Sequence, residues 1–450
     1  METSALESLA RRELQLVMTY APAGLGHLRV MDALYHGLPE IVNPVVLGSQ
    51  DRSIQTLHRI TSIHPLLRKV FEWFQSGPLS AQFHRLYRAS LRSRTGQIYE
   101  ELVSLIEQKL EPPDEVLVVS THFGLAHQLA AIKERLQREK RVKVFLAVVV
   151  TDDTFQHVWH VDGADLIVVP SHVTRDKYVA YGARLGAKDR IEVLPYPLAL
   201  NLGRPLDSLE MMNKADQLSA TGREPVRVSI PISGAAVGTA FFLQLIEGLR
   251  EKSSRFYFHV VSKKAPYTSV FISRIEGMSG VEARVASVDR EVVDAYDALF
   301  DDHVISLEVT KPSEQAFKAL LGTELRGGVV LLFSEPVGRQ EFENLDFLGR
   351  HGLVPSDQAN AKLWEMAESN ATIEDIRKTE LFDKARAWRG VRLPRDARKA
   401  VDFIWWLLTT GLFSQMMSCR AHPCTGDEYP DELGSNGVTR FWSLIVSAQA

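Results

Sequence analysis

The chain has 450 residues, of which 45% are hydrophobic and 24% are charged, and its formal net charge at pH 7 is -4. This length allows two or three domains with separate cores, and the composition is that of a globular protein. The slight negative charge argues against a general nucleic-acid binder, which is usually basic. Cys419 and Cys424 are the only cysteines, so neither a disulfide framework nor a structural zinc site, even with His422, is expected.

The first 34 residues predict a strand, a glycine turn and a helix. Residues 14–18 are an apolar run, residues 21–27 contain a proline and two glycines, and apolar residues over 28–34 have helical spacing. Such a unit directs backbone N–H groups and the positive end of a helix toward the turn, which favours an anion or an acceptor oxygen. His27 stands at the mouth of this turn. The same pattern also fits an ordinary first turn of an α/β domain.

The first half continues as alternating strands and helices, which predicts an α/β fold with a doubly wound parallel sheet. The expected strands are 41–47, 116–120, 142–150, 166–169 and 191–194, with helices over 125–138 and 178–185. Ligands of such sheets bind beyond the carboxyl ends of the strands. The polar residues that follow strand ends here are His27, His122, Asp152 and His157. We expect them to converge on one crevice, although each alone could simply cap a helix.

Residues 54–110 are predicted to be almost entirely helical, and they mix aromatic with basic side chains. The mixture comprises Phe71, Trp73, Phe74, Phe83, Tyr87, Arg85, Arg88, Arg92 and Arg94. A face of this kind can lie on anionic lipid headgroups. The interpretation that we favour is a set of helices that cover a sheet and keep their arginines in water.

A domain boundary is expected within residues 201–224, which lose strand periodicity and gain polar residues, glycine and proline. The predicted domains are 1–205 and 225–395, followed by a C-terminal helix and tail over 396–450. A second strand, glycine turn and helix occupy 226–250, with the same preference for an anion. Further strands are expected at 256–261, 281–285, 305–309 and 329–333. Two similar domains facing each other across a cleft are therefore predicted.

Five short motifs lie at these turns. In the first half they are Gly24-Leu25-Gly26-His27 and Thr151-Asp152, the latter followed by His157 and Trp159. In the second half they are Ser233-Gly234 with Gly238, Lys311-Pro312-Ser313-Glu314, and Gln340-Glu341 with Asn344. Ser313 is placed to cap a helix whose first turn contains Glu314.

In this order the motifs resemble GT-B glycosyltransferases of the monogalactosyldiacylglycerol synthase and processive diacylglycerol glucosyltransferase type. They are more distantly similar to the lipid-linked N-acetylglucosaminyltransferase of peptidoglycan synthesis. The resemblance covers residues 14–353 as a series of short motifs. It implies two Rossmann-like domains and an inverting hexosyltransferase that moves a sugar from a UDP-sugar to a lipid or other hydrophobic acceptor.

The resemblance also assigns roles to residues. The second domain would bind the donor, with Glu314 on the ribose and the glycine-loop amides near the diphosphate. The expected donor residues are Ser233, Gly234, Gly238, Lys311, Ser313, Glu314, Gln340, Glu341 and Asn344. The acceptor would lie on the first domain, near Gly24, Gly26, His122 and Trp159. The candidate catalytic residues are His27, Asp152 and His157, of which His27 or Asp152 would be the base.

Partners and location follow from the same observations. A helix N-terminus can stabilise the charge on a departing diphosphate, so no metal is strictly required, and no tightly bound cofactor or nucleic acid is expected. Residues 1–12 have no secretory apolar segment, which favours a cytoplasmic location. The predicted helix over 400–417 would cross back to the first domain, as in GT-B proteins, or lie peripherally on a membrane surface.

Two other functions stay open. One is a UDP-sugar 2-epimerase-like enzyme on the same fold, which would need no separate acceptor. The other is a non-catalytic relative that binds nucleotide-sugars.

Overall fold

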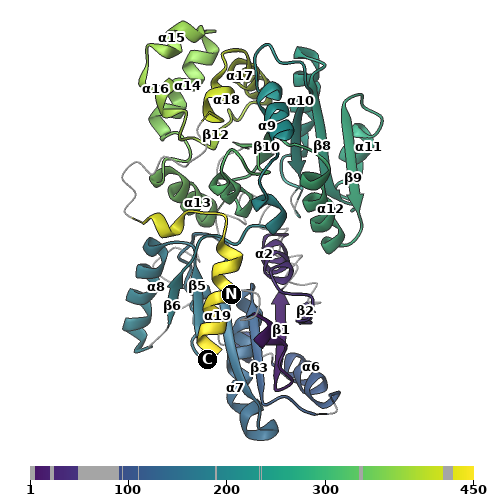
Figure 1. The fold of residues 1–450 in the computed structure, drawn as a ribbon, viewed down its shortest axis with the longest axis vertical. Helices are drawn as coiled ribbons and strands as arrows, with labels where there is room; N and C mark the ends of the chain where they lie inside the picture. The colour runs from purple at the N-terminus through teal and green to yellow at the C-terminus, as the bar shows by residue number, and fades with distance from the viewer. Residues whose placement is uncertain are drawn as a thin grey trace. The chain divides into compact units, whose positions relative to one another are not determined.

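The computed structural model divides the chain into two units, one made of Met1–Leu200 with Asp431–Ala450 and the other of Asn201–Pro430 (Figure 1). The structure describes residues 6–20, 25–48, 91–93, 95–109, 111–187, 190–232, 234, 236–333, 338–418 and 429–449. Each unit contains one parallel sheet with helices around it. None of the helices within these ranges combines the length and the apolar character that crossing a membrane requires.

The first unit is built on a six-stranded parallel sheet with the strand order β2-β1-β3-β4-β5-β6. Its strands are β1 (Leu14–Tyr20), β2 (Val45–Gly48), β3 (Glu115–Ser120), β4 (Lys143–Val149), β5 (Leu166–Val169) and β6 (Ile191–Val193). Its described helices include α2 (Leu25–His36), α6 (Gly96–Glu107), α7 (Phe123–Lys140), α8 (His172–Leu185) and α19 (Gly437–Gln449). The 3₁₀ turns η1 (Ser8–Ala10) and η2 (His157–Trp159) complete it.

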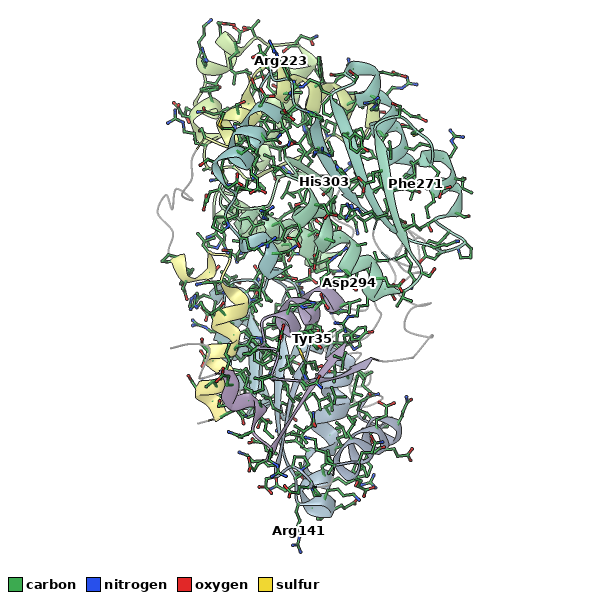
Figure 2. All side chains as sticks on the ribbon, turned by 45° about the vertical axis from the view of Figure 1, so that its right-hand side comes forward. Tyr35, Arg141, Arg223, Phe271, Asp294 and His303 are labelled. Carbon is green, nitrogen blue, oxygen red and sulfur yellow. The ribbon has the colours of Figure 1, made fainter. Side chains whose placement is uncertain are left out.

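Local sequence explains how these elements start and stop. Strand β4 is buried along most of its length, because an apolar run suits a parallel strand that is covered on both faces. Ser171 caps α8 by accepting a hydrogen bond from the Thr174 N–H. Arg141, labelled in Figure 2, closes α7 in the left-handed conformation with φ 60°.

The second unit has six parallel strands in the order β12-β11-β10-β7-β8-β9, which is the Rossmann arrangement. The strands are β7 (Val226–Pro231), β8 (Phe256–Lys263), β9 (Val281–Ala286), β10 (Leu307–Thr310), β11 (Val329–Leu332) and β12 (Gly390–Arg392). The larger helices are α9 (Ser208–Gln217), α10 (Thr239–Lys252), α12 (Asp289–Asp302), α13 (Arg339–Arg350), α14 (Asp357–Glu368) and α17 (Ala397–Thr409). Shorter elements are η3 (Leu200–Gly203), α11 (Ser269–Ile275), η4 (Glu314–Leu320), α15 (Ile373–Arg377), α16 (Glu380–Lys384) and α18 (Leu412–Met416). The 3₁₀ turn η5 (Pro430–Glu432) lies at the boundary, and its Asp431 and Glu432 belong to the first unit.

The predicted α/β class with two doubly wound parallel sheets is confirmed, while several local details differ. The stretch over 201–224 contains α9, which begins with a capping box formed by Asp207 and Glu210. The second unit also contains the short strand β12, which is not among the predicted strands. The predicted strand over 41–47 is shorter and begins at Val45. The aromatic and basic side chains from 71 to 88, with Arg94 and the cysteine segment at 419–424, lie outside the described residues.

The apolar helix expected over 400–417 is found as α17 and α18, and both belong to the second unit. Phe403 and Trp406 lie in that unit's core, and the Trp406 indole donates a hydrogen bond of 2.9 Å to the Ala371 carbonyl. The segment that returns to the first unit is α19. Its Trp442 is fully buried and donates to the Leu34 carbonyl of α2 at 2.8 Å.

A row of polar side chains crosses the second sheet in register: Glu308 on β10, Ser229 on β7, His259 on β8 and Glu282 on β9. In-register neighbours point to the same face of a sheet. The Glu308 carboxylate is fully buried and forms an ion pair with Lys318, which is itself buried. The Ser229 hydroxyl donates to the same carboxylate at 3.1 Å. The middle of this sheet is therefore held by a buried ion pair in addition to apolar packing.

Removing one partner of a buried ion pair leaves the other charge uncompensated in the protein interior. We expect Lys318→Met to lower the free energy of unfolding by about 3–5 kcal/mol, measured by urea denaturation followed by circular dichroism. The matched control is Lys362→Met, which removes an exposed pair with Glu365 and is expected to cost about 1 kcal/mol or less. The double variant Glu308→Leu with Lys318→Met should recover part of the loss. Equal midpoints for Lys318→Met and the native chain would contradict this account.

Candidate functional site

Two loops of the first unit meet where its strand order reverses, between β1 and β3. Helix α2 begins at Leu25, so Gly26 and His27 lie in its first turn, while Gly24 is outside the described residues. Thr121 follows β3, and its hydroxyl donates a hydrogen bond of 2.8 Å to the His27 carbonyl. This bond ties the loop after β3 to the start of α2.

The His27 side chain is the centre of a polar and aromatic cluster. Its Nδ1 atom lies 3.0 Å from the Thr151 hydroxyl at the end of β4, and its ring centroid is 5.2 Å from that of His122. The Trp159 ring lies 5.7 Å from His27 and 5.5 Å from Phe123. The structure therefore places His27 against His122, which are two of the four strand-end residues expected to converge, and also against Trp159.

Thr151 is held in turn by a buried tyrosine. The Tyr196 hydroxyl donates to the Thr151 carbonyl at 2.9 Å, which fixes the residue that contacts the His27 imidazole. An imidazole with a fixed hydroxyl partner, half-buried among rings, is suited to exchange a proton with a substrate hydroxyl. The role of Thr151 was missed because a threonine at a strand end has no signal of its own, apart from standing before Asp152.

The other two candidate catalytic residues are placed differently from each other. Asp152 is half-buried at the end of β4, next to Thr151. The His157 ring stacks on Tyr181 of α8, with centroids 4.2 Å apart, and meets Phe155 edge-on. His157 and Trp159 begin and end the 3₁₀ turn η2, and residues two apart in such a turn project to different sides. Trp159 thus contacts His27 and Phe123, whereas His157 contacts Phe155 and Tyr181.

A neighbouring carboxylate, Asp153, has a structural role. It is buried and accepts hydrogen bonds from the Ser171 hydroxyl at 2.5 Å and from the Thr174 hydroxyl at 2.6 Å. Both donors belong to the start of α8. Asp153 therefore fastens the end of β4 to the helix that follows β5.

At the glycine turn of the second unit, the backbone packs closely against an aromatic ring. Gly238 is the N-cap of α10 with φ 90°, and a Cβ there would lie 2.4 Å from the Phe333 Cε2 atom. Phe333 follows β11, and its ring lies 4.5 Å from that of Phe242. The Gly234 carbonyl accepts from the Tyr267 hydroxyl at 2.9 Å, and Ser233 is outside the described residues.

The loop after β10 is fastened to the first turns of α13. Lys311 forms an ion pair with Glu341, which is buried. The Asn344 side-chain amide, also buried, donates to the Pro312 carbonyl at 3.3 Å. Two of the predicted donor motifs are therefore in direct contact, and some of their polar atoms form an ion pair or a hydrogen bond with each other.

The remaining donor candidates lie beside these contacts. Ser313 is the N-cap residue of η4, although its side chain makes no capping hydrogen bond, and Glu314 begins η4 half-buried. Gln340 is half-buried in the first turn of α13. The turns after β7, β10 and β11 thus lie at the carboxyl edge of one sheet, where its strand order reverses between β7 and β10. The N-termini of α10 and α13 add positive partial charge at this edge.

No family model matches the chain, and no curated protein matches its sequence. Among solved structures, it is similar to S. aureus MnaA in a co-structure with UDP, with 13% identity, 93% of this chain and 94% of that chain covered, and a TM-score of 0.46. It is also similar to UDP-GlcNAc 2-epimerase from Neisseria meningitidis bound to UDP-GlcNAc, with 11% identity, 97% and 100% coverage, and a TM-score of 0.47. For Arabidopsis thaliana UGT89C1 complexed with UDP-L-rhamnose the values are 13%, 98%, 99% and 0.45. At these identities the likeness concerns the fold alone.

The geometry at Gly238 predicts that a methyl group there is not tolerated. We expect Gly238→Ala to lower the free energy of unfolding by about 1–3 kcal/mol, since a left-handed φ strains alanine and the Phe333 ring must move. Differential scanning calorimetry would measure the change. Gly349→Ala is the matched control, because a Cβ at this α13 position meets nothing within 4 Å. The variant Gly238→Ala with Phe333→Leu should relieve the steric part only. A native-like transition for Gly238→Ala would refute the close approach.

Proposed function

We propose that the chain is a UDP-sugar-dependent glycosyltransferase of the GT-B type, a hexosyltransferase that transfers a sugar to a lipid or other hydrophobic acceptor with inversion. The observation that supports it most is that three predicted donor motifs follow β7, β10 and β11, which are neighbouring strands around the reversal point of a Rossmann-ordered sheet. Two helices begin at this edge, so their N-terminal amides favour a diphosphate without a metal.

In this proposal the second unit binds the donor. The carboxylate of Glu314 accepts hydrogen bonds from the two ribose hydroxyls, because a carboxylate offers two acceptor oxygens. The backbone at Gly234 and Gly238 and the side chain of Gln340 approach the diphosphate. Lys311, held by Glu341, supplies a positive charge near the same phosphates.

The first unit provides the acceptor site and the base. His27, supported by Thr151, removes the proton from the acceptor hydroxyl as that oxygen forms a bond to the anomeric carbon of the sugar. The bond from the anomeric carbon to the diphosphate oxygen breaks, and the helix N-termini stabilise the negative charge of UDP. The half-buried ring of Phe123 suits an apolar or sugar-like acceptor, and the buried rings of His122 and Trp159 pack against it. Asp152 is the second candidate base.

Donor binding can be tested without knowing the acceptor. Isothermal titration calorimetry with UDP measures the free energy of donor binding. We expect Glu314→Ala to weaken this binding by about 1–3 kcal/mol, because hydrogen bonds to a charged group are lost. Glu374→Ala, on the exposed side of α15, is the control and should bind as the native chain does. Failure of the folded native chain to bind UDP or UDP-sugars would remove the proposal, and an unchanged constant for Glu314→Ala would remove Glu314 from the site.

The base can be separated from donor binding by kinetics. With an acceptor from a panel that includes diacylglycerol in detergent, His27→Ala should cut kcat at least about a hundredfold and change UDP affinity little. Thr151→Val should cause a smaller loss in kcat, because the imidazole stays but its hydroxyl partner goes. Equal losses of turnover and donor affinity in His27→Ala would mean that His27 only shapes the loop. Epimerised product from UDP-N-acetylglucosamine without any acceptor would favour the epimerase-like alternative instead.

A further inference from the structure

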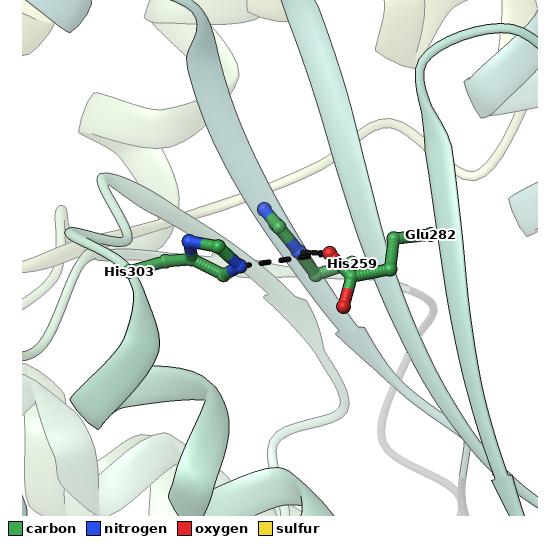
Figure 3. Close-up of side chains that lie close together, drawn as sticks. All are labelled: His259, Glu282 and His303. Carbon is green, nitrogen blue, oxygen red and sulfur yellow. Dashed lines mark ion pairs between the residues drawn. The ribbon is translucent and has the colours of Figure 1, made fainter.

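The polar row of the second sheet ends in a cluster of two histidines and a glutamate (Figure 3). His259 lies on β8 and Glu282 on β9, and His303 follows α12, where Figure 2 also labels it. The His259 Nδ1 atom is 3.0 Å and the His303 Nε2 atom 3.5 Å from the same Glu282 oxygen, Oε2. The three ligand atoms all lie within 4.8 Å of one another. Among the described residues, this is the cluster of three His, Cys, Asp or Glu side chains that is close enough to hold a metal ion.

The two nitrogen–oxygen separations, 3.0 and 3.5 Å, are close to what a small divalent cation requires. A tetrahedral zinc ion with bonds of about 2 Å holds its ligand atoms about 3.3 Å apart. Two imidazole nitrogens and one carboxylate oxygen are donors that zinc and related transition metals accept. The His259 side chain is fully buried, but the Glu282 side chain is 34% exposed and that of His303 25% exposed. The cluster therefore has a side through which an ion and a water ligand can enter.

The carboxylate is oriented by a separate set of contacts. The Arg284 Nε atom donates to the other oxygen of Glu282, Oε1, at 2.9 Å, and its guanidinium also pairs with Asp302 at 2.9 Å. This leaves Oε2 facing the two histidines. Support of this kind for a ligand is a common property of metal sites. The formal charges of Arg227 and Arg284 are balanced by Glu282 and Asp302, so the cluster does not repel a cation outright.

Both histidines favour the neutral form that metal ligands need. Burial, with His303 and Arg227 nearby, lowers the pKa of His259 to about 4. Burial and Arg227 also lower the pKa of His303. A guanidinium only donates, so the contact of 3.1 Å between Arg227 and the His259 Nε2 atom places the ring proton on Nδ1. A cation at Nδ1 moves this proton to Nε2, and Arg227 must then turn aside.

We propose that His259, Glu282 and His303 form a binding site for a divalent transition metal of the zinc class. The site lies on strands β8 and β9, away from the turns after β7, β10 and β11 that carry the proposed donor site. It joins two strands to the end of α12, so a bound ion stabilises the fold of the second unit and takes no part in sugar transfer. The proposal stands whether or not the chain uses UDP-sugars.

Zinc binding to the full chain is measured at neutral pH by isothermal titration calorimetry with zinc chloride. Cobalt chloride provides a second probe, because bound cobalt is detected by its visible absorption. One ion per chain is expected, with a rise in melting temperature on zinc addition. His303→Ala and Glu282→Gln should each weaken zinc binding at least tenfold and abolish the thermal shift. His36→Ala is the control; it lies in the first unit, with a side chain 58% exposed, and should bind zinc normally.

A fourth variant separates a metal site from an ordinary hydrogen-bonded cluster. Arg227→Met removes both the competing donor at His259 and a positive charge, so it should tighten zinc binding by at least threefold. Binding of UDP should stay unchanged in all of these variants. No zinc binding at millimolar concentration, or equal binding by the native chain, His303→Ala and Glu282→Gln, would overturn the proposal.

Discussion

A parallel sheet has to return its chain to the same edge before each new strand, and this constraint places the polar residues of both units. Every loop that leaves a strand opens at the carboxyl edge, and the strand order reverses once in each sheet. His27 and His122 flank the reversal in the first sheet, and the turn at Gly238 and the loop at Lys311 flank it in the second. These partners are far apart in sequence, and strand order alone makes them neighbours.

Where a sequence signal was local and strong, it predicted the structure well. The apolar run over 142–150 became β4 within one residue at each end. Helix α9 was missed although Asp207 and Glu210 form a capping box, because glycine, proline and lost strand periodicity dominated that stretch. Strand β12 has three residues, too few for any alternation to show. Periodicity identified the apolar helix α17, but an apolar face does not specify which core it joins.

The candidate sites could be predicted only in part, because their contacts depend on the pairing of distant strands. His27 and Thr151 are 124 positions apart in the sequence, and neither local segment has a pattern that predicts their contact. His259 and Glu282 meet because β8 and β9 pair in one register. The buried pair of Glu308 and Lys318 bears on the register of β10 against β7, since a shift of one residue would turn the carboxylate to the other face of the sheet.

Because helix α19 belongs to the first unit, that unit is completed only after the second unit has been synthesised. The first unit takes residues from both sides of the second, and Gly437 lies so near Pro195 that a Cβ would be 2.2 Å from the proline carbonyl oxygen. The indole of Trp442 fills the first core only after the whole second unit has been synthesised. During synthesis, the first unit therefore lacks the packing of α19 while the second unit leaves the ribosome. This lengthens the period in which exposed apolar surface of the first unit can bind chaperones or aggregate.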